Sequence, residues 1–121
     1  MPGKLVHIEF PASDANRTST FYSGLFGWQF QDAGMPDIDY LMFQGEPGGA
    51  VFTSEKGGSG PVVYFETDDI DRDVARVREL GGEAEDKAPI PHVGWFARCE
   101  DTEGNTFSFF QSDESVPPPS A

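Results

Sequence analysis

The chain has 121 residues, with 21 acidic against 8 basic side chains, which gives a formal net charge of −13 at pH 7. Because the basic residues form no stripe that could neutralise a run of phosphates, we expect neither nucleic acid nor an anionic membrane surface as a partner. No apolar run approaches the roughly 20 residues of a membrane span, the start lacks the apolar core of a signal peptide, and Cys99 is the single cysteine. These features predict a cytoplasmic protein, whose many carboxylates are typical of a solvated, self-repelling surface or of life at high salt.

Gly and Pro make up 24 of the 121 residues, which predicts many turns and therefore many short elements. Two helices and eight strands are predicted among them. Asp14 is placed to cap a first helix that ends at Gly27. A second helix is expected from Ile70 to a stop at Gly81, since apolar residues recur there at spacings of three and four. Runs of β-branched and aromatic residues between the turns are the predicted strands, at 4–10, 28–33, 40–44, 50–54, 61–66, 83–88, 94–99 and 105–111.

The order strand, helix, three strands occurs twice, and the sequence matches itself without a gap when it is shifted so that Asp14 falls on Asp69. These two residues are both at a helix cap, and the same shift sets Gly27 on Gly82 near a helix end. Conservative matches also pair Tyr40 with Trp95 and Thr53 with Ser108. We therefore predict a single domain over residues 1–121, made of two βαβββ modules at about 3–57 and 58–112, with a flexible, Pro-rich tail at 113–121.

The motifs of both halves resemble the vicinal oxygen chelate superfamily, which includes glyoxalase I, extradiol dioxygenases and bleomycin-binding proteins. In the first half the resemblance rests on Val6–Pro11 and on Leu25–Trp28. In the second half it rests on Asp68-Asp69-Ile70, on Gly94-Trp95-Phe96 and on the run Glu100–Asn105. The resemblance implies an α+β fold of the glyoxalase, bleomycin resistance and dihydroxybiphenyl dioxygenase type: tandem βαβββ modules, each a curled mixed sheet, that face one another around a cavity.

The metal-dependent members of this superfamily place four ligands in the cavity. The resemblance puts these positions on His7, Thr53, Val62 and Ser108. Only His7 is a normal ligand for a divalent cation, so we predict no metal cofactor. An irregular site for Fe, Mn, Ni or Zn, in which Glu9 and Glu66 join His7, is the alternative.

His7 and Glu9 are the candidate catalytic residues, because they alternate along one strand and share a face. A carboxylate in mid-strand needs a partner when it is buried, so Glu9 either lines the cavity as a base or cation anchor, or makes a structural hydrogen bond. The candidate walls of a pocket for a planar or aromatic ligand are Tyr40, Thr53, Tyr64, Glu66, Trp95, Arg98, Ser108 and Phe110. Each aromatic ring among them could instead pack in the core.

The function that these patterns favour is small-molecule binding without the usual four-ligand metal site, in a protein of glyoxalase or bleomycin-resistance type. The resemblance also implies a homodimer. The alternative function is that of a lyase, isomerase or oxygenase in which His7 and Glu9 act as acid and base or help to hold a metal. An interaction module with a closed cavity is a third interpretation.

Overall fold

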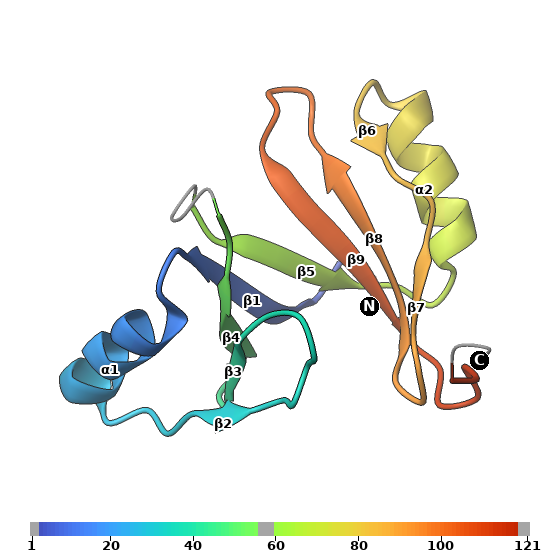
Figure 1. Ribbon diagram of the computed structural model, residues 1–121. Helices are drawn as coiled ribbons and strands as arrows, with labels where there is room; N and C mark the ends of the chain where they lie inside the picture. The colour runs from blue at the N-terminus through green and yellow to red at the C-terminus, as the bar shows by residue number, and fades with distance from the viewer. Residues whose placement is uncertain (1–2, 56–59, 119–121) are drawn as a thin grey trace. The chain divides into compact units, whose positions relative to one another are not determined.

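The computed structural model describes residues 3–55 and 60–118, and the chain divides into two compact units (Figure 1). The N-terminal unit is Val6–Val62, and the C-terminal unit is Val63–Ala121 together with Met1–Leu5. Each unit holds a helix and a mixed sheet, as the predicted α+β class requires. The predicted module boundary at 57/58 lies outside the described residues.

The N-terminal unit contains β1 (Leu5–Ala12), α1 (Ala15–Phe26), β2 (Gln31–Asp32), β3 (Tyr40–Phe43) and β4 (Gly48–Thr53). The strands lie in the order β2-β3-β4-β1, with β1 parallel to β4 and the other neighbours antiparallel. Asp14 caps α1 by accepting a hydrogen bond from the Arg17 N–H at 3.0 Å, and Gly27 ends the helix at φ 74°. Both ends of the predicted first helix are therefore confirmed.

The C-terminal unit contains β5 (Val62–Glu66), α2 (Ile70–Glu79), β6 (Glu83–Ala84), β7 (Ala88–Ile90), β8 (Gly94–Glu100) and β9 (Thr106–Ser112). Its strands lie in the order β5-β9-β8-β6, with β5 parallel to β9 and β7 also paired with β8. The predicted strand 83–88 is thus two short strands. Between them Arg78 Nη2 donates to the Ala84 carbonyl at 2.8 Å and to Asp86 Oδ1 at 3.2 Å.

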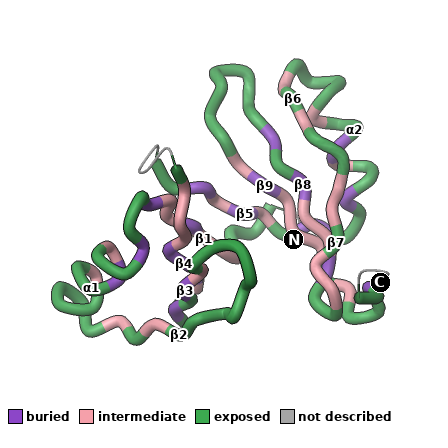
Figure 2. The backbone as a smooth tube through the Cα atoms, viewed as in Figure 1, coloured by how far each residue is buried: buried purple, intermediate pink, exposed green. Residues whose placement is uncertain are grey.

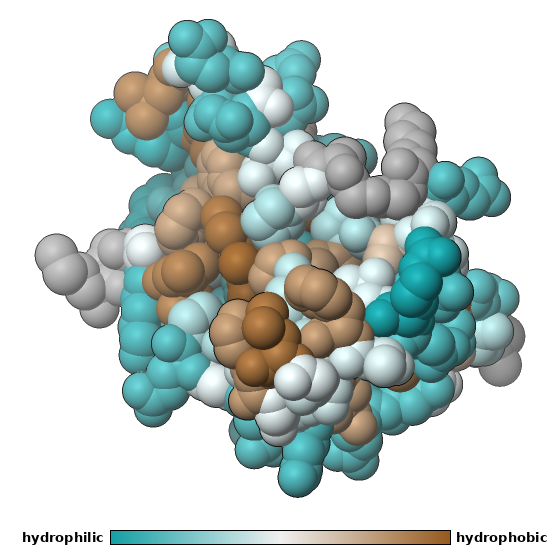
Figure 3. Space-filling model, turned by 90° about the vertical axis from the view of Figure 1, so that its left-hand side faces the viewer, coloured by the Kyte–Doolittle hydropathy of each residue, from teal (hydrophilic) through white to brown (hydrophobic). Residues whose placement is uncertain are grey.

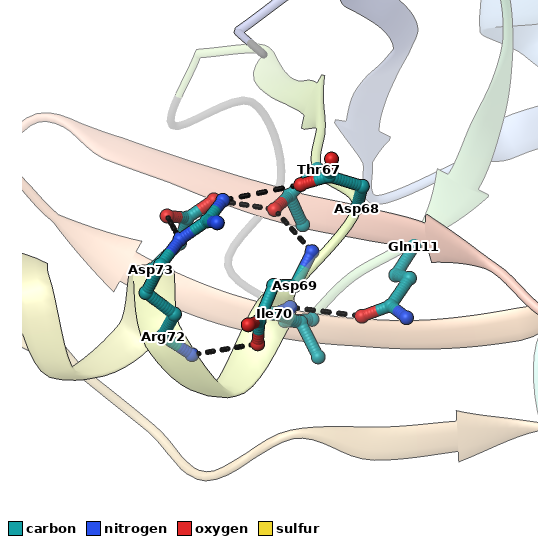
Figure 4. Close-up of polar contacts among 7 residues, drawn as sticks. All are labelled: Thr67, Asp68, Asp69, Ile70, Arg72, Asp73 and Gln111. Atoms are coloured by element: carbon teal, nitrogen blue, oxygen red, sulfur yellow. Dashed lines mark hydrogen bonds and ion pairs between the residues drawn. The ribbon is translucent and has the colours of Figure 1, made fainter.

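Polar contacts fix the start of α2 (Figure 4). Asp69 caps the helix by accepting from the Arg72 N–H at 3.1 Å, while Thr67 Oγ1 accepts from the Asp69 N–H and donates to Asp73. Gln111 of β9 accepts from the Ile70 N–H at 2.8 Å, which ties the first turn of the helix to the sheet. The predicted second helix is confirmed at its start, and it ends at Glu79, two residues before Gly81.

Each helix covers one face of its own sheet, and a cluster of buried apolar residues lies between helix and sheet in each unit; Figure 2 shows the burial of the described residues along the backbone. In the N-terminal unit Ala12, Leu41 and Val51 form a cluster with Ala15 of α1. In the C-terminal unit Ala97 of β8 packs with two residues of α2. We call this side of each sheet its helix face and the opposite side its open face. Within the described residues, no helix has the length and apolarity to cross a bilayer.

The first residues of the predicted flexible tail pack against the C-terminal unit. Val116 is buried, at 2% exposure, and its carbonyl accepts a hydrogen bond from the His92 N–H at 2.9 Å. An apolar side chain in a buried place ties the chain to the C-terminal unit at this point, and the flexibility of residues 113–121 stays a prediction. Residues 119–121 of the predicted tail lie outside the described part of the chain.

Candidate functional site

His7, Glu9 and Tyr40 meet on the open face of the N-terminal unit. Residues at alternate positions of β1 point away from the helix face that holds Phe10 and Ala12, which places His7 and Glu9 on the open face. The sheet register brings β3 to the same place, because Ala50 of β4 is the partner of both Glu9 and Met42. Tyr40, two residues before Met42, therefore shares this face.

The three polar side chains form one hydrogen-bonded line. The Tyr40 hydroxyl donates to Glu9 Oε2, and its oxygen lies 2.9 Å from His7 Nε2. Since a phenol has a single hydrogen, His7 Nε2 is the donor to the Tyr40 oxygen in this arrangement. His7 Nε2 also lies 3.5 Å from Glu9 Oε2. The Tyr40 hydroxyl is thus hydrogen-bonded to both the Glu9 carboxylate and the His7 imidazole, and these two groups lie within ion-pair distance of each other.

Burial makes this network more than a surface contact. The Glu9 side chain is only 10% exposed, whereas the His7 side chain is 26% exposed. A carboxylate this well buried needs a donor, which Tyr40 supplies from far along the chain. The structure shows a hydrogen bond to Glu9 from Tyr40, and the role of Glu9 as a base or cation anchor stays a prediction. It also leaves one end of the network, His7, within reach of solvent.

Apolar side chains surround the network on the same face. Phe52 is the cross-strand partner of Tyr40, and their ring centroids are 6.4 Å apart. Met42 lies in the next row and is 44% exposed. Sequence reasoning missed both residues as candidate pocket walls. The signal that would have found them is the pairing of β3 with β4, since Tyr40, Met42 and Phe52 then fall on one side.

Two predicted pocket residues lie on the wrong face, and the reason is a slip in the repeat. Glu9 and Tyr64 each lie five residues before a helix cap, so they correspond to one another. The cross-strand partner of Glu9 is Ala50, and that of Tyr64 is Ser108. The shift that sets Asp14 on Asp69 would set Ala50 on Asn105, so Ser108 comes three positions later than the repeat predicts. Thr53, three residues after Ala50, therefore points to the helix face with its partner Ala12. Thr53 thus lies on the opposite side of the sheet from His7 and Glu9.

Trp95 is displaced in the same way. By register the counterpart of Tyr40 is Phe96, because Phe96 pairs with Phe110 as Tyr40 pairs with Phe52. Trp95 lies one residue earlier and packs against the core under α2. Its indole N–H donates to Asp113 at 3.2 Å, and the Lys87 ammonium lies 4.6 Å from its ring. Trp95 thus lies on the helix face of the C-terminal sheet, and Phe96 lies on the open face.

The remaining predicted residues belong to the C-terminal unit. Tyr64, Ser108 and Arg98 are successive cross-strand neighbours on its open face, and Phe110 shares that face one row away. Ser108 is fully buried, and among the described residues its hydroxyl oxygen has no hydrogen-bond partner. Glu66 is exposed at the end of β5, where its backbone N–H donates to the Lys4 carbonyl at 2.8 Å.

Arg98 lines a groove of about 490 Å³ in this unit. Three carboxylates line the same groove, from Glu83, Glu85 and Glu100. Because acids outnumber the single guanidinium, the groove does not favour the anionic ligand that Arg98 alone would suggest.

Cys99, beneath the same groove, is not an activated nucleophile. It is 2% exposed, and burial raises the pKa of its thiol to about 11.

The residues on the open face of the N-terminal unit do not fit the four-ligand metal site of the resembled superfamily. His7 and Glu9 can each supply one ligand, but both already bond to Tyr40. Their neighbours on this face, among them Ala50 and Phe52, have no atom that binds a hard divalent cation. Over residues 3–55 and 60–118, no group of three or more His, Cys, Asp and Glu side chains could hold a metal ion. The alternative set that adds Glu66 stays a prediction.

Comparison with known proteins gives consistent results. A family model described as the Glyoxalase/Bleomycin resistance protein/Dioxygenase superfamily matches residues 4–109. A "Glyoxylase-like domain-containing protein" from Didymella fabae is 36% identical over 115 residues, covering 86% of this chain and 90% of the relative.

Solved structures show the same fold at low sequence identity. A methylmalonyl-CoA epimerase in complex with methylmalonyl-CoA and NH4+ has a TM-score of 0.71 at 16% identity, covering 98% of this chain and all of that chain. The methylmalonyl-CoA epimerase from Mycobacterium tuberculosis has a TM-score of 0.68 at 15% identity, covering 97% of this chain and 89% of that chain. A hypothetical protein from Bacillus halodurans gives 0.68 at 16% identity, with 96% and 99% covered.

Proposed function

Because the chain belongs to the Glyoxalase/Bleomycin resistance protein/Dioxygenase superfamily, we propose that it is a small-molecule binding protein whose polar anchor is the His7–Tyr40–Glu9 network. The observation that carries the proposal is the Glu9 carboxylate, which is buried on the open face and hydrogen-bonded to Tyr40. Phe52 and Met42 provide apolar surface beside it. A small polar centre within an apolar lining is the usual composition of a ligand site.

The charge of the N-terminal unit favours a cationic, planar ligand. From Val6 to Val62 the sequence contains only two basic residues, Arg17 and Lys56, and Arg17 belongs to α1, on the helix face. Glu9 and the rings of Tyr40 and Phe52 can together hold a cation by charge and by cation–π contact. Coenzyme A carries several phosphates, whereas the described residues of this unit include one Lys or Arg side chain, that of Arg17, away from the open face. The ligand of the epimerase structures is therefore not the expected one.

A ligand panel with a charge series tests this proposal. Benzyltrimethylammonium is the cationic probe, and benzylsulfonate is an anion of similar shape. We expect the cation alone to raise the melting temperature, and Glu9→Gln, which keeps a hydrogen-bond acceptor but removes the charge, to weaken its binding by about tenfold or more. Equal binding of both probes, or undiminished binding to Glu9→Gln, would contradict the proposal.

Proton transfer is a second candidate function, favoured by the continuous hydrogen bonding from His7 through Tyr40 to Glu9. Such a line can take a proton from a bound molecule and return it. Incubation with a small, uncharged carbonyl compound, cyclohexanone, in D2O measures this directly, as deuterium gained at the carbon beside the carbonyl. Exchange that Tyr40→Phe slows by roughly a hundredfold supports catalysis, and absence of exchange contradicts it for this substrate.

A further inference from the structure

The two repeats differ at one place beside their helices. In the first repeat Tyr22 of α1 packs against the buried cluster, and its ring centroid lies 5.3 Å from that of Phe10 and 5.4 Å from that of Trp28. The surroundings of α1 are rich in apolar side chains, as Figure 3 shows from the side of this helix. The shift that superposes the two helix caps places Val77 of α2 on Tyr22. The second repeat therefore lacks the aromatic ring that fills this place in the first.

A groove of about 310 Å³ lies beside Val77, between α2 and β9. Val77 and Phe109 of β9 give the groove an apolar lining, and both side chains are half-buried. Leu80, one helical turn after Val77, lines the groove as well and is 63% exposed. Gly3 adds backbone to the lining, and its N–H donates to the Glu66 carbonyl at 3.1 Å. The volume is at the lower end of the range for ligand sites, which suits a molecule with one ring.

Two side chains of opposite charge also line the groove. Asp73 and Arg76 are three residues apart and therefore lie on one side of α2. Asp73 accepts hydrogen bonds from Thr67 and from Arg72 Nε (Figure 4), and a carboxylate has further acceptor positions. Arg76 Nη1 donates to Glu79 at 3.0 Å, and a guanidinium has further donors. A ligand with both an ammonium and a carboxylate group complements this pair, and its zero net charge avoids repulsion by a chain of net charge −13.

We propose that this groove binds a free aromatic amino acid. The ring of the ligand packs against Val77, Leu80 and Phe109, where the first repeat has the ring of Tyr22. The ammonium group of the ligand faces Asp73, and its carboxylate faces Arg76. Because a flat ring can stack on Phe109 and a branched aliphatic chain cannot, the groove selects aromatic over aliphatic amino acids.

The groove is separate from the proposed ligand site. It lies beside α2 on the helix face of the C-terminal unit, whereas the His7–Tyr40–Glu9 network lies on the open face of the N-terminal unit. The two proposals can therefore fail independently. Failure of the cationic probe to bind beside Glu9 does not bear on the groove, and an unused groove leaves the hydrogen bonds of Tyr40 unchanged.

Amide chemical-shift mapping of the full chain with L-phenylalanine tests the proposal. We expect saturable shifts at residues 73–80 and around Phe109. L-leucine, which lacks the ring, and 3-phenylpropionate, which lacks the ammonium group, should each bind at least about fivefold more weakly. Absence of saturable shifts at these residues would overturn the proposal, and so would equal binding of either analogue.

Val77→Tyr gives the second repeat the residue that fills this place in the first. The variant should fold normally, as circular dichroism can show, and its new ring should weaken the binding of L-phenylalanine by at least about tenfold. A folded Val77→Tyr chain that binds L-phenylalanine as tightly as the wild type would overturn the proposal.

Arg76→Gln keeps the proposal testable if Val77→Tyr does not fold, because Arg76 is an exposed side chain. This variant should weaken the binding of L-phenylalanine by about fivefold, since the ligand carboxylate loses its charged donor. Arg78→Gln is the matched control on the same helix, because the Arg78 guanidinium lies outside the groove lining and donates to the Ala84 carbonyl. It should leave the affinity unchanged, and equal weakening by the two glutamine variants would contradict the assigned role of Arg76 and overturn the proposal.

Discussion

The two repeats of the chain put different chemistry on one framework. The first carries His7, Glu9 and Tyr40 on its open face. Counting from the helix caps and the sheet registers, the second has Val62, Tyr64 and Phe96 at the corresponding positions. The second repeat thus has valine in place of His7, tyrosine in place of Glu9 and phenylalanine in place of Tyr40. Both repeats have the same scaffold, but the His7–Tyr40–Glu9 network belongs to the first repeat.

The helix faces of the two repeats differ less, because both must bury apolar surface against a helix. Val51 and Leu41 fill this role in the first, and Ala97 and Phe109 fill it in the second. The helix caps are the same residue, Asp14 and Asp69, with hydrogen bonds of 3.0 and 3.1 Å. Packing and capping therefore keep the two repeats alike, while the open face is where they diverge.

The largest predicted effect concerns a close backbone approach in the first repeat. A Cβ at Gly49 would lie 2.0 Å from the Ile8 carbonyl oxygen, whereas Phe107, the counterpart in the second repeat, carries a full side chain. Gly49→Ala should therefore lower the free energy of unfolding by roughly 3 kcal/mol or more. Gly24→Ala, at a site with open space, is the control and should not destabilise. Chemical denaturation measures both, and a Gly49→Ala protein of normal stability would contradict this prediction.

The next effect tests the polar network itself. Tyr40→Phe removes the donor to Glu9 and the acceptor for His7, which should cost about 1–3 kcal/mol. Tyr22→Phe makes the same chemical change on α1, where Tyr22 packs against the core cluster, and should cost less than about 0.5 kcal/mol. Equal losses in urea denaturation for the two variants would mean that the hydrogen bonds of Tyr40 contribute nothing particular.

Acid should lower the stability of the chain through two carboxyl groups of the second repeat. The side-chain hydrogen bond from Asn105 lowers the pKa of Asp101, and the hydroxyl of Ser115 lowers the pKa of Asp113. A carboxyl whose pKa is lower in the folded chain stabilises it above the unfolded value near 4 and loses this contribution as the pH falls through the folded value. We expect Asp101→Asn to flatten the dependence of the melting temperature on pH below about 4.

Asp37, an exposed carboxyl for which the described residues show no hydrogen bond, is the control for this experiment. Asp37→Asn should keep the wild-type pH dependence. If the two asparagine variants give the same curve, the hydrogen bonds around Asp101 are not the cause of the acid sensitivity.

The smallest effect concerns Cys99. Burial raises the pKa of its thiol to about 11, so the native protein at pH 8 should react with a disulfide reagent only on unfolding. The free energy of unfolding should also fall as the pH rises from about 9, the pKa of the thiol in the unfolded chain, to about 11, because the thiol of the unfolded chain ionises first. Rapid labelling of the native chain at pH 8 would show that the thiol is accessible and reactive.

Local signals in the sequence were enough to predict the elements. Asp14, Gly27 and Asp69 act through their immediate neighbours, so a single chain reveals the helix starts and the end of α1. The faces of the later strands were harder, because turn lengths make the repeat slip between the helix caps and the last strands. That slip is why Thr53 and Trp95 were misplaced, since one residue reverses a side chain in a strand.

The candidate site was partly visible for the same reason. His7 and Glu9 are two residues apart on one strand, so their shared face follows from the sequence. Their link through Tyr40 depends on the pairing of β1 with β4 and of β4 with β3, which joins residues far apart in the chain. Nothing in the local sequence of Tyr40 distinguishes a hydrogen-bonding phenol from a ring in a pocket wall.

The central claim, a ligand site on the open face of the first repeat, is tested most directly by amide chemical-shift mapping with benzyltrimethylammonium. We predict shifts at His7–Glu9 and at Tyr40–Met42, absent from the residues around Phe96, and lost in Tyr40→Phe. Shifts confined to the second repeat, or unchanged shifts in a folded Tyr40→Phe variant, would contradict the claim.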